Sequence, residues 1–201
     1  MKKIFSLLLA LSLVFCLTSA AFADANQTDY NWTDVGSAVL DVFGDDSNIC
    51  KIDEVDALFW VPGYFHIVEL TPEDEAENCI GYLVNNDGSA FMLLYYQDMP
   101  VPTLDNLLSS YRASGHNARM ITVNDVPAVL MQDTTSNSLS VSFQTEEDKM
   151  LQFFFYPASD ENYAVIFDLI ISSILPNEML IPETAEPVAT PVNPVSGLIS
   201  K

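Results

Sequence analysis

The fold is decided by two aromatic stretches, Phe91-Met92-Leu93-Leu94-Tyr95-Tyr96 and Leu151-Gln152-Phe153-Phe154-Phe155-Tyr156. Aromatic residues at this density favour β-strands, in which successive side chains point to opposite faces of the sheet. In both stretches the two alternating sets of side chains are largely apolar, so each strand must be covered on both faces. We therefore expect a central sheet with helices packed against both of its faces.

Turn residues indicate that neighbouring strands are joined by hairpins. Asn86-Asp87-Gly88 is a strong signal for a tight turn, and residues 124–125 and 145–148 also separate apolar segments. Because hairpins connect antiparallel strands, the sheet is predicted to be largely antiparallel. Serines alternate with apolar residues over residues 138–143, so that strand is expected to have one wet face and to lie towards an edge. Strands are expected at residues 57–61, 64–70, 80–84, 90–97, 119–123, 127–132, 139–144 and 150–156.

Helices are predicted where apolar residues recur at helical spacing. The first spans residues 31–43, with Gly44 as its C-cap. The second follows the N-cap Thr103 and closes at Gly115, and the third runs from residue 159 to about residue 174, before Pro176 prevents continuation. Together these elements predict an α+β protein, an α/β/α sandwich around a largely antiparallel sheet.

The N-terminus has the layout of a cleavable secretory signal. Lys2 and Lys3 precede an apolar run, and small residues end it at Ala23, so cleavage is expected between Ala23 and Asp24. The run is shorter than the roughly 20 residues of a membrane span, so no transmembrane anchor is expected after cleavage. A lipoprotein at Cys16 is a less favoured alternative, because the bulky Phe15 precedes it. The predicted localisation is secreted or extracytoplasmic, in the cell envelope.

The rest of the chain divides into three predicted regions. Residues 24–50 form an N-terminal extension with one helix, residues 51–176 form one domain, and residues 177–201 form a disordered tail. The tail is rich in proline, at positions 182, 187, 191 and 194, and shows no hydrophobic periodicity.

Charge narrows the range of partners. The formal charge is −21, and removal of the two signal lysines lowers it to −23. The few remaining basic residues cannot form a stripe that neutralises phosphates, so nucleic acid and anionic lipid surfaces are not expected partners. A surface of one charge sign also keeps an exported protein soluble.

Cys50 and Cys79 are the cysteines that remain once Cys16 has left with the signal. An even pair in an exported protein is a disulfide candidate. The alternative is two buried thiols that behave as small hydrophobic side chains. Their spacing matches no redox or zinc motif.

The linear pattern of residues 51–175 resembles the PsbP-like fold family, which includes the extrinsic PsbP protein of photosystem II, the Ran-binding protein Mog and many small exported bacterial proteins. The resemblance rests on Phe59-Trp60-Val61-Pro62-Gly63-Tyr64, on the helix at residues 104–114, on the strand-turn-strand at residues 121–130, and on the closing Ile171-Ser172-Ser173-Ile174. These motifs are structural, and members of the family differ in function. The resemblance therefore implies a fold and no activity.

No reactive group is assembled in the sequence. His66 lies within a predicted strand and His116 follows a helix, and neither belongs to a nucleophile or metal motif. Glycine-rich phosphate loops are absent, and the acidic runs lack the alternating spacing of a calcium loop. We expect no catalytic residue, no metal and no cofactor.

The remaining signal is the high density of aromatic residues. Aromatic side chains that were exposed beside acidic loops would form a site for a hydrophobic or cationic ligand. Tyr95, Tyr96 and Asp98 at a strand end are the first candidates for ligand binding, and Trp60 is the second. The sequence thus favours a secreted, non-catalytic binding module for an unknown protein or small ligand. The alternatives are an enzyme with a dispersed acid-base site and a structural or assembly subunit of a cell-envelope complex.

Overall fold

The computed structural model describes residues 28–44, 46–146 and 148–176. The predicted signal peptide and the proline-rich tail lie outside these residues. In chain order the elements are β1 (Thr28–Tyr30), α2 (Trp32–Phe43), β2 (Ser47–Ile52), β3 (Ala57–Pro62), β4 (Phe65–Ile67), α3 (Pro72–Ala76), β5 (Cys79–Asn85), β6 (Phe91–Asp98), α4 (Leu104–Ala113), β7 (Asn117–Val123), β8 (Val126–Asp133), β9 (Ser138–Gln144), β10 (Lys149–Tyr156), α5 (Glu161–Ser172) and β11 (Leu175–Pro176).

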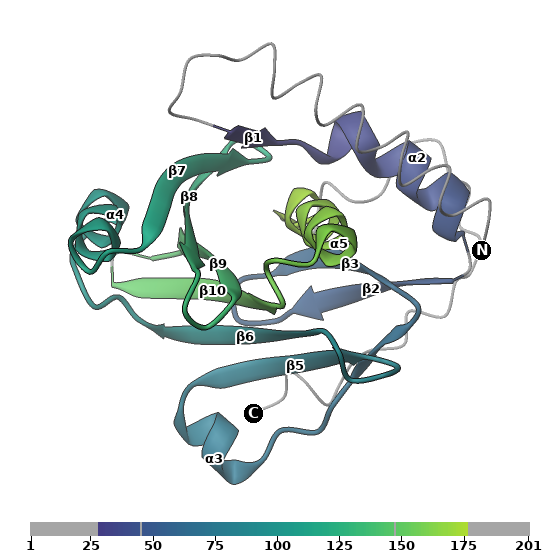
Figure 1. Cartoon of the computed structure of the whole chain (residues 1–201), viewed down its shortest axis with the longest axis horizontal. Helices are drawn as coiled ribbons and strands as arrows, with labels where there is room; N and C mark the ends of the chain where they lie inside the picture. The colour runs from purple at the N-terminus through teal and green to yellow at the C-terminus, as the bar shows by residue number, and fades with distance from the viewer. Residues whose placement is uncertain (1–27, 45, 147, 177–201) are drawn as a thin grey trace.

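The strands form two sheets. The larger has the order β1-β7-β8-β9-β10-β6-β5-β4, and the smaller has the order β11-β3-β2. Within the described residues every pairing is antiparallel except that of β1 with β7. The larger sheet curls, so that β7 and β8 pass on one side of α5 while β6 and β5 pass on the other (Figure 1). The prediction of an α+β fold with a largely antiparallel sheet is confirmed.

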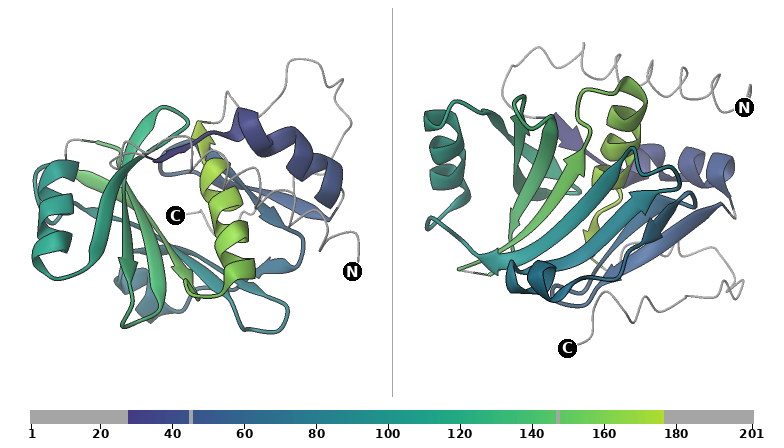
Figure 2. Two further views of the ribbon diagram at one scale, coloured as in Figure 1. Left: turned by 45° about the horizontal axis from the view of Figure 1, so that its top comes forward. Right: turned by 60° about the horizontal axis from the view of Figure 1, so that its bottom comes forward.

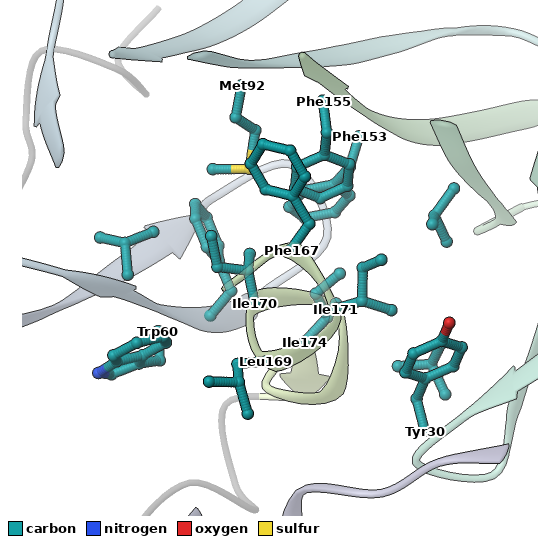
Figure 3. Close-up of a cluster of buried hydrophobic side chains, with 14 of the residues drawn as sticks. Tyr30, Trp60, Met92, Phe153, Phe155, Phe167, Leu169, Ile170, Ile171 and Ile174 are labelled. Atoms are coloured by element: carbon teal, nitrogen blue, oxygen red, sulfur yellow. The ribbon is translucent and has the colours of Figure 1, made fainter. Parts of the chain in front are cut away.

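Helix α5 fills the centre of this curled sheet. Asp160 caps its N-terminus by accepting hydrogen bonds from the backbone of Asn162 and Tyr163. The helix is apolar on most of its surface, as expected of a helix buried all round. Phe167 packs against Phe155, with ring centroids 4.9 Å apart, and points towards the aromatic layer of the sheet (Figure 3). The aromatic strand β10 and the apolar helix α5 are thus the two halves of the main core.

Helix α4 covers part of the opposite face of the sheet. Thr103 caps it by accepting a hydrogen bond from the backbone N–H of Asn106 at 3.2 Å. Its buried Leu104 and Leu107 form a separate cluster with Val129 of β8 and Met150 of β10. The strands therefore lie between α4 and α5 (Figure 2), and the predicted two-sided covering of the sheet is confirmed here. Farther along this face, over β5, β6 and β10, aromatic side chains stack on one another and are only half-buried.

The segment expected to be an N-terminal extension is built into the same core. Helix α2 begins at the N-cap Asn31 and ends at Gly44, as predicted, and it buries Trp32, Val35 and Val39. Strand β1 adds to the edge of the larger sheet, and β2 pairs with β3 along its whole length. The expected boundary at residue 50 falls inside β2. Strands β1, β2 and β11 and the short helix α3 are elements that we do not predict from the sequence.

The strand with alternating serines is wrongly predicted to lie towards an edge with a wet face. It is β9, which pairs with both β8 and β10, and Ser138, Ser140 and Ser142 are all buried. Larger neighbours cover these small side chains: Gln152 donates hydrogen bonds to Ser142 Oγ at 3.1 Å and to the Tyr111 hydroxyl at 3.3 Å. The alternating serines of β9 therefore face the closely packed interior and not solvent.

Candidate functional site

The predicted aromatic ligand site does not converge in the structure. Trp60 is fully buried on β3, with its ring 5.0 Å from that of Phe43, which corrects the expectation that it could form an exposed patch. Tyr95 and Tyr96 are neighbours on β6, so they point to opposite faces of the sheet. Asp98 at the strand end forms an ion pair with Lys149. A ligand-binding role for Tyr95, Tyr96 and Asp98 stays a prediction, but Tyr95 lies on the opposite face of the sheet from Tyr96 and Asp98.

The predicted disulfide between Cys50 and Cys79 is absent, and both cysteines are free and buried. Cys50 lies on β2 of the smaller sheet, and Cys79 lies on β5 of the larger one. Burial raises the pKa of Cys50 to about 12 and also raises that of Cys79, so both are held as thiols. They act as small hydrophobic side chains, the alternative that the sequence left open.

The two histidines lie on different elements, and neither lines one of the two hollows described below. His66 is exposed on β4, and His116 follows α4, with Nδ1 at 4.0 Å from a carboxylate oxygen of Asp133. No group of three or more histidine, cysteine or acidic side chains within residues 28–44, 46–146 and 148–176 could hold a metal ion. No helix in that part of the chain is long and apolar enough to cross a membrane.

A cavity of about 580 Å³ opens where the two sheets meet at the C-terminal end of α5. Its apolar lining comes from buried core residues of both sheets and of the segment after α5, while Val126, which is 37% exposed, stands at its edge. This volume lies within the range of about 300–1,000 Å³ that is usual for small-molecule sites. The main apolar lining residues are Ala57, Val123, Phe143, Leu151, Ile174 and Leu175.

The walls of this cavity are held together by Asn124. This residue lies in the β7–β8 turn with a left-handed backbone (φ 47°), between the cavity-lining Val123 and Val126. Its side-chain amide donates hydrogen bonds to the carbonyls of Ser172 at 2.7 Å and Ile174 at 3.0 Å. Its side-chain oxygen accepts a hydrogen bond from the backbone N–H of Trp32 at 2.8 Å. One side chain thereby ties the turn to the end of α5 and to the start of α2.

A second contact holds α5 against the smaller sheet. The hydroxyl of Ser173 accepts a hydrogen bond from the backbone N–H of Trp60 at 2.8 Å and donates one to the carbonyl of Ile170 at 2.6 Å. Beyond it, Leu175 pairs with Leu58 in a two-residue strand. Hydrogen bonds and strand pairing therefore tie together the elements that frame the cavity.

Acidic side chains surround the mouth of the cavity. Asp53, Glu54 and Asp56 come from the β2–β3 turn, and Glu146 comes from the β9–β10 turn. All four are exposed, and no lysine or arginine lines the cavity within the described part of the chain. Lys51 on β2 forms ion pairs with two of these residues, Asp53 at 2.9 Å and Asp56 at 3.4 Å. Hydrogen bonding to Asp53 and then its charge raise the pKa of Lys51, so this lysine stays protonated.

A second hollow of about 330 Å³ adjoins the cavity. It shares Val126, Gln144, Thr145 and Glu146 with the larger cavity, and Leu104 at the start of α4 closes its far end. An elongated ligand could therefore extend from the junction of the sheets towards α4.

Comparison with known proteins identifies the fold. No family model and no curated protein sequence matches the chain. Among solved structures, the solution structure of cyanobacterial PsbP (CyanoP) from Synechocystis sp. PCC 6803 matches with a TM-score of 0.50 and 14% identity, over 64% of this chain and 91% of that one. The chain has a PsbP-like fold. A crystal structure from Bacteroides thetaiotaomicron also matches, with a TM-score of 0.39 and 10% identity, over 64% of this chain and 47% of that one.

Sequence reasoning predicts the PsbP-like fold but misses the cavity on it. The acidic residues of the β2–β3 turn are not recognised as part of a site because β2 itself is not predicted. One signal was present in the sequence: the run Asp53-Glu54-Val55-Asp56 joins two apolar segments. The Asn124-Asp125 turn is recognised as a turn, but its contacts with the end of α5 span 48 and 50 positions and cannot be read locally.

Proposed function

We propose that this protein is an exported, non-catalytic binding module whose ligand occupies the cavity between the two sheets. The observation that carries the proposal is the cavity of about 580 Å³ whose floor is made of core side chains such as Phe143 and Leu151. Apolar floors of this size bind small molecules because burial of their apolar surface is favourable. Export is supported by the signal pattern of residues 1–23.

The fixed frame of the cavity supports binding in place of a purely structural role. Asn124 and Ser173 hold its walls through hydrogen bonds to backbone groups. A site formed in advance does not have to spend binding free energy on ordering its own loops. If the junction of the two sheets bound no ligand, close packing of side chains there would be more stable than a cavity.

The proposal is tested by blocking the cavity. Val126→Trp places a large ring at its edge, on a side chain that is already 37% exposed, so the fold should tolerate it. Ile49→Trp is the matched control, because Ile49 is 44% exposed on β2 and does not line the cavity. A fluorescent apolar probe such as dansylamide should bind the unmodified protein and Ile49→Trp alike, and bind Val126→Trp at least tenfold more weakly. Equal binding to all three proteins would refute the proposal.

Native ligands are sought by capture from the cell envelope, with residues 24–201 as bait, followed by mass spectrometry of bound small molecules. A molecule retained by the unmodified protein and by Ile49→Trp but lost from Val126→Trp would occupy the cavity.

One feature favours a second function, an enzyme with a dispersed acid-base site. Carboxylates reach the cavity mouth from two separate turns, through Glu54 on one and Glu146 on the other, and paired carboxylates can perform acid-base chemistry. The captured molecule distinguishes the two functions. Recovery of the molecule unchanged after prolonged incubation supports the binding module, whereas conversion that stops in Glu54→Gln or Glu146→Gln supports the enzyme.

A further inference from the structure

We propose that the cavity selects an apolar molecule that carries a positive charge, such as an organic amine with an aromatic or alkyl body. This inference names the ligand class of the proposed binding site and therefore rests on the proposed function. It follows from the combination of an apolar floor and a negatively charged mouth in one hollow.

Charge is arranged on more than one wall of the cavity. Asp53, Glu54 and Asp56 lie on the turn that joins the strands of the smaller sheet, and Glu146 lies on a turn of the larger sheet. A cationic group at the mouth would be attracted from both sides while the body of the molecule contacts Phe143 and Leu151. An anionic group would be repelled by the same carboxylates.

Lys51 offsets part of this negative potential without entering the cavity. Its ammonium group forms ion pairs with Asp53 and Asp56, its side chain is 47% exposed, and it is not among the residues that line the cavity. Glu54 and Glu146 are the two acidic lining residues without a described ion pair to Lys51. These two carboxylates are therefore the ones that a ligand cation meets with the least competition.

The charge of the whole molecule acts in the same direction. With a formal charge of −21, the protein attracts cations over distances of about one Debye length, roughly 8–10 Å at moderate salt. The carboxylates at the cavity mouth direct this general attraction towards the cavity. A small amine fits a hollow of this volume, whereas a folded protein partner would need a broad flat surface.

Three probes with the same apolar group test the charge preference. Dansylcadaverine is a cation, dansylamide is neutral and dansylglycine is an anion. We expect dansylcadaverine to bind at least about tenfold more tightly than dansylamide at low salt and dansylglycine to bind more weakly still, with the preference shrinking as salt is added. Each measurement is repeated with Val126→Trp and Ile49→Trp.

Single substitutions place the charge effect at the cavity mouth. Glu54→Gln and Glu146→Gln should each weaken dansylcadaverine binding about threefold, and weaken it more than dansylamide binding, as expected for partly screened charges near a surface. Glu69→Gln is the matched control, because Glu69 is exposed, carries the same charge and does not line the cavity. Lys51→Met should strengthen dansylcadaverine binding.

The outcomes separate this inference from the proposed function. If all three probes bind equally and Val126→Trp weakens all of them, the cavity binds ligands but has no charge preference, and the inference fails alone. If Glu69→Gln weakens dansylcadaverine binding as much as Glu54→Gln does, the preference comes from net charge and the inference also fails. If Val126→Trp changes no binding, the proposed function fails.

Discussion

Replacement of Asn124 by alanine should strongly lower the stability of the protein. The side chain makes hydrogen bonds to three backbone groups: the N–H of Trp32 and the carbonyls of Ser172 and Ile174. These groups belong to segments 48 to 92 positions away in sequence. Asn124→Ala would leave all three without this partner and would keep a left-handed backbone angle at alanine, which lacks the short polar side chain that lets asparagine adopt it.

The size of the effect can be worked out from these contacts. Each lost hydrogen bond costs about 1 kcal/mol, and the left-handed backbone costs alanine about 1 kcal/mol more than asparagine, which adopts this conformation more readily. The free energy of unfolding of Asn124→Ala should therefore fall by about 4 kcal/mol, a large share of the roughly 5–15 kcal/mol that stabilises a typical domain. The midpoint of thermal unfolding should fall by about 10 °C for a domain of this size.

Asp125→Ala provides the matched control in the same turn. Asp125 is exposed and also has a positive φ, 68°, but no hydrogen bond of its side chain is described. Alanine there carries only the backbone cost of about 1 kcal/mol. The comparison is made by urea unfolding followed through the fluorescence of Trp32 and Trp60. If Asn124→Ala and Asp125→Ala lose equal stability, the hydrogen bonds of Asn124 do not hold the walls of the cavity.

Three further predictions concern buried groups. Asp168 accepts a hydrogen bond from the hydroxyl of Tyr30 at 3.1 Å, and burial raises the pKa of Asp168 from 3.8 to about 6. The contribution of Asp168 to stability is therefore full below about pH 4 and is lost as the pH rises through about 6. Asp168→Asn should remove that loss. Between pH 4 and pH 7, the free energy of unfolding of Asp168→Asn should therefore rise relative to that of the unmodified protein by on the order of 3 kcal/mol. A difference between the two proteins that does not change with pH would contradict the burial of a charge. Native protein of residues 24–201 should leave Cys50 and Cys79 unreactive towards Ellman's reagent and release two thiols only on unfolding, and a mass two hydrogens lower would show a disulfide instead. Trp60→Phe should change the free energy of unfolding by less than about 1 kcal/mol. The buried indole N–H has no hydrogen-bond partner among the described residues, so the gain from its removal offsets the loss of buried apolar area from the smaller ring. A loss above about 3 kcal/mol would indicate that the N–H has a partner.

The elements that could be predicted from the sequence are those whose signals are local. Helix α4 needs only its leucine stripe and the cap at Thr103, and the β5–β6 hairpin needs only its turn residues. Strand β10 is predicted because its two alternating faces are both apolar over residues 151–156. Strand β2 has a partner in β3 but no clear alternation of its own, since it exposes Asn48 and Ile49 together. Pairing, and not local propensity, makes it a strand.

The sequence predictions are wrong where the burial or pairing of a residue depends on elements that are distant in the sequence. Ser140 and Ser142 alternate with apolar side chains as solvent-facing residues would, yet both are buried on β9, which lies between β8 and β10. The disulfide prediction counts cysteines but has no information on where the strands that carry Cys50 and Cys79 lie in the fold. The cavity is missed for the same reason, because its lining comes from segments as distant as Ala57 and Leu175.

The cavity lies at a corner of the fold where regular elements give way to turns, and this position bears on its function. Its floor belongs to the main core, so Phe143 or Leu151 could change only at a cost in stability. Its mouth is formed by the β2–β3 and β9–β10 turns, whose exposed acidic residues can change with little effect on the core. A chain with the same fold could therefore keep an apolar hollow and alter the charge of what it admits. If the carboxylates here set that choice, charge-reversing substitutions such as Glu54→Lys and Glu146→Lys should turn the preference from dansylcadaverine to dansylglycine without moving the unfolding midpoint by more than about 3 °C.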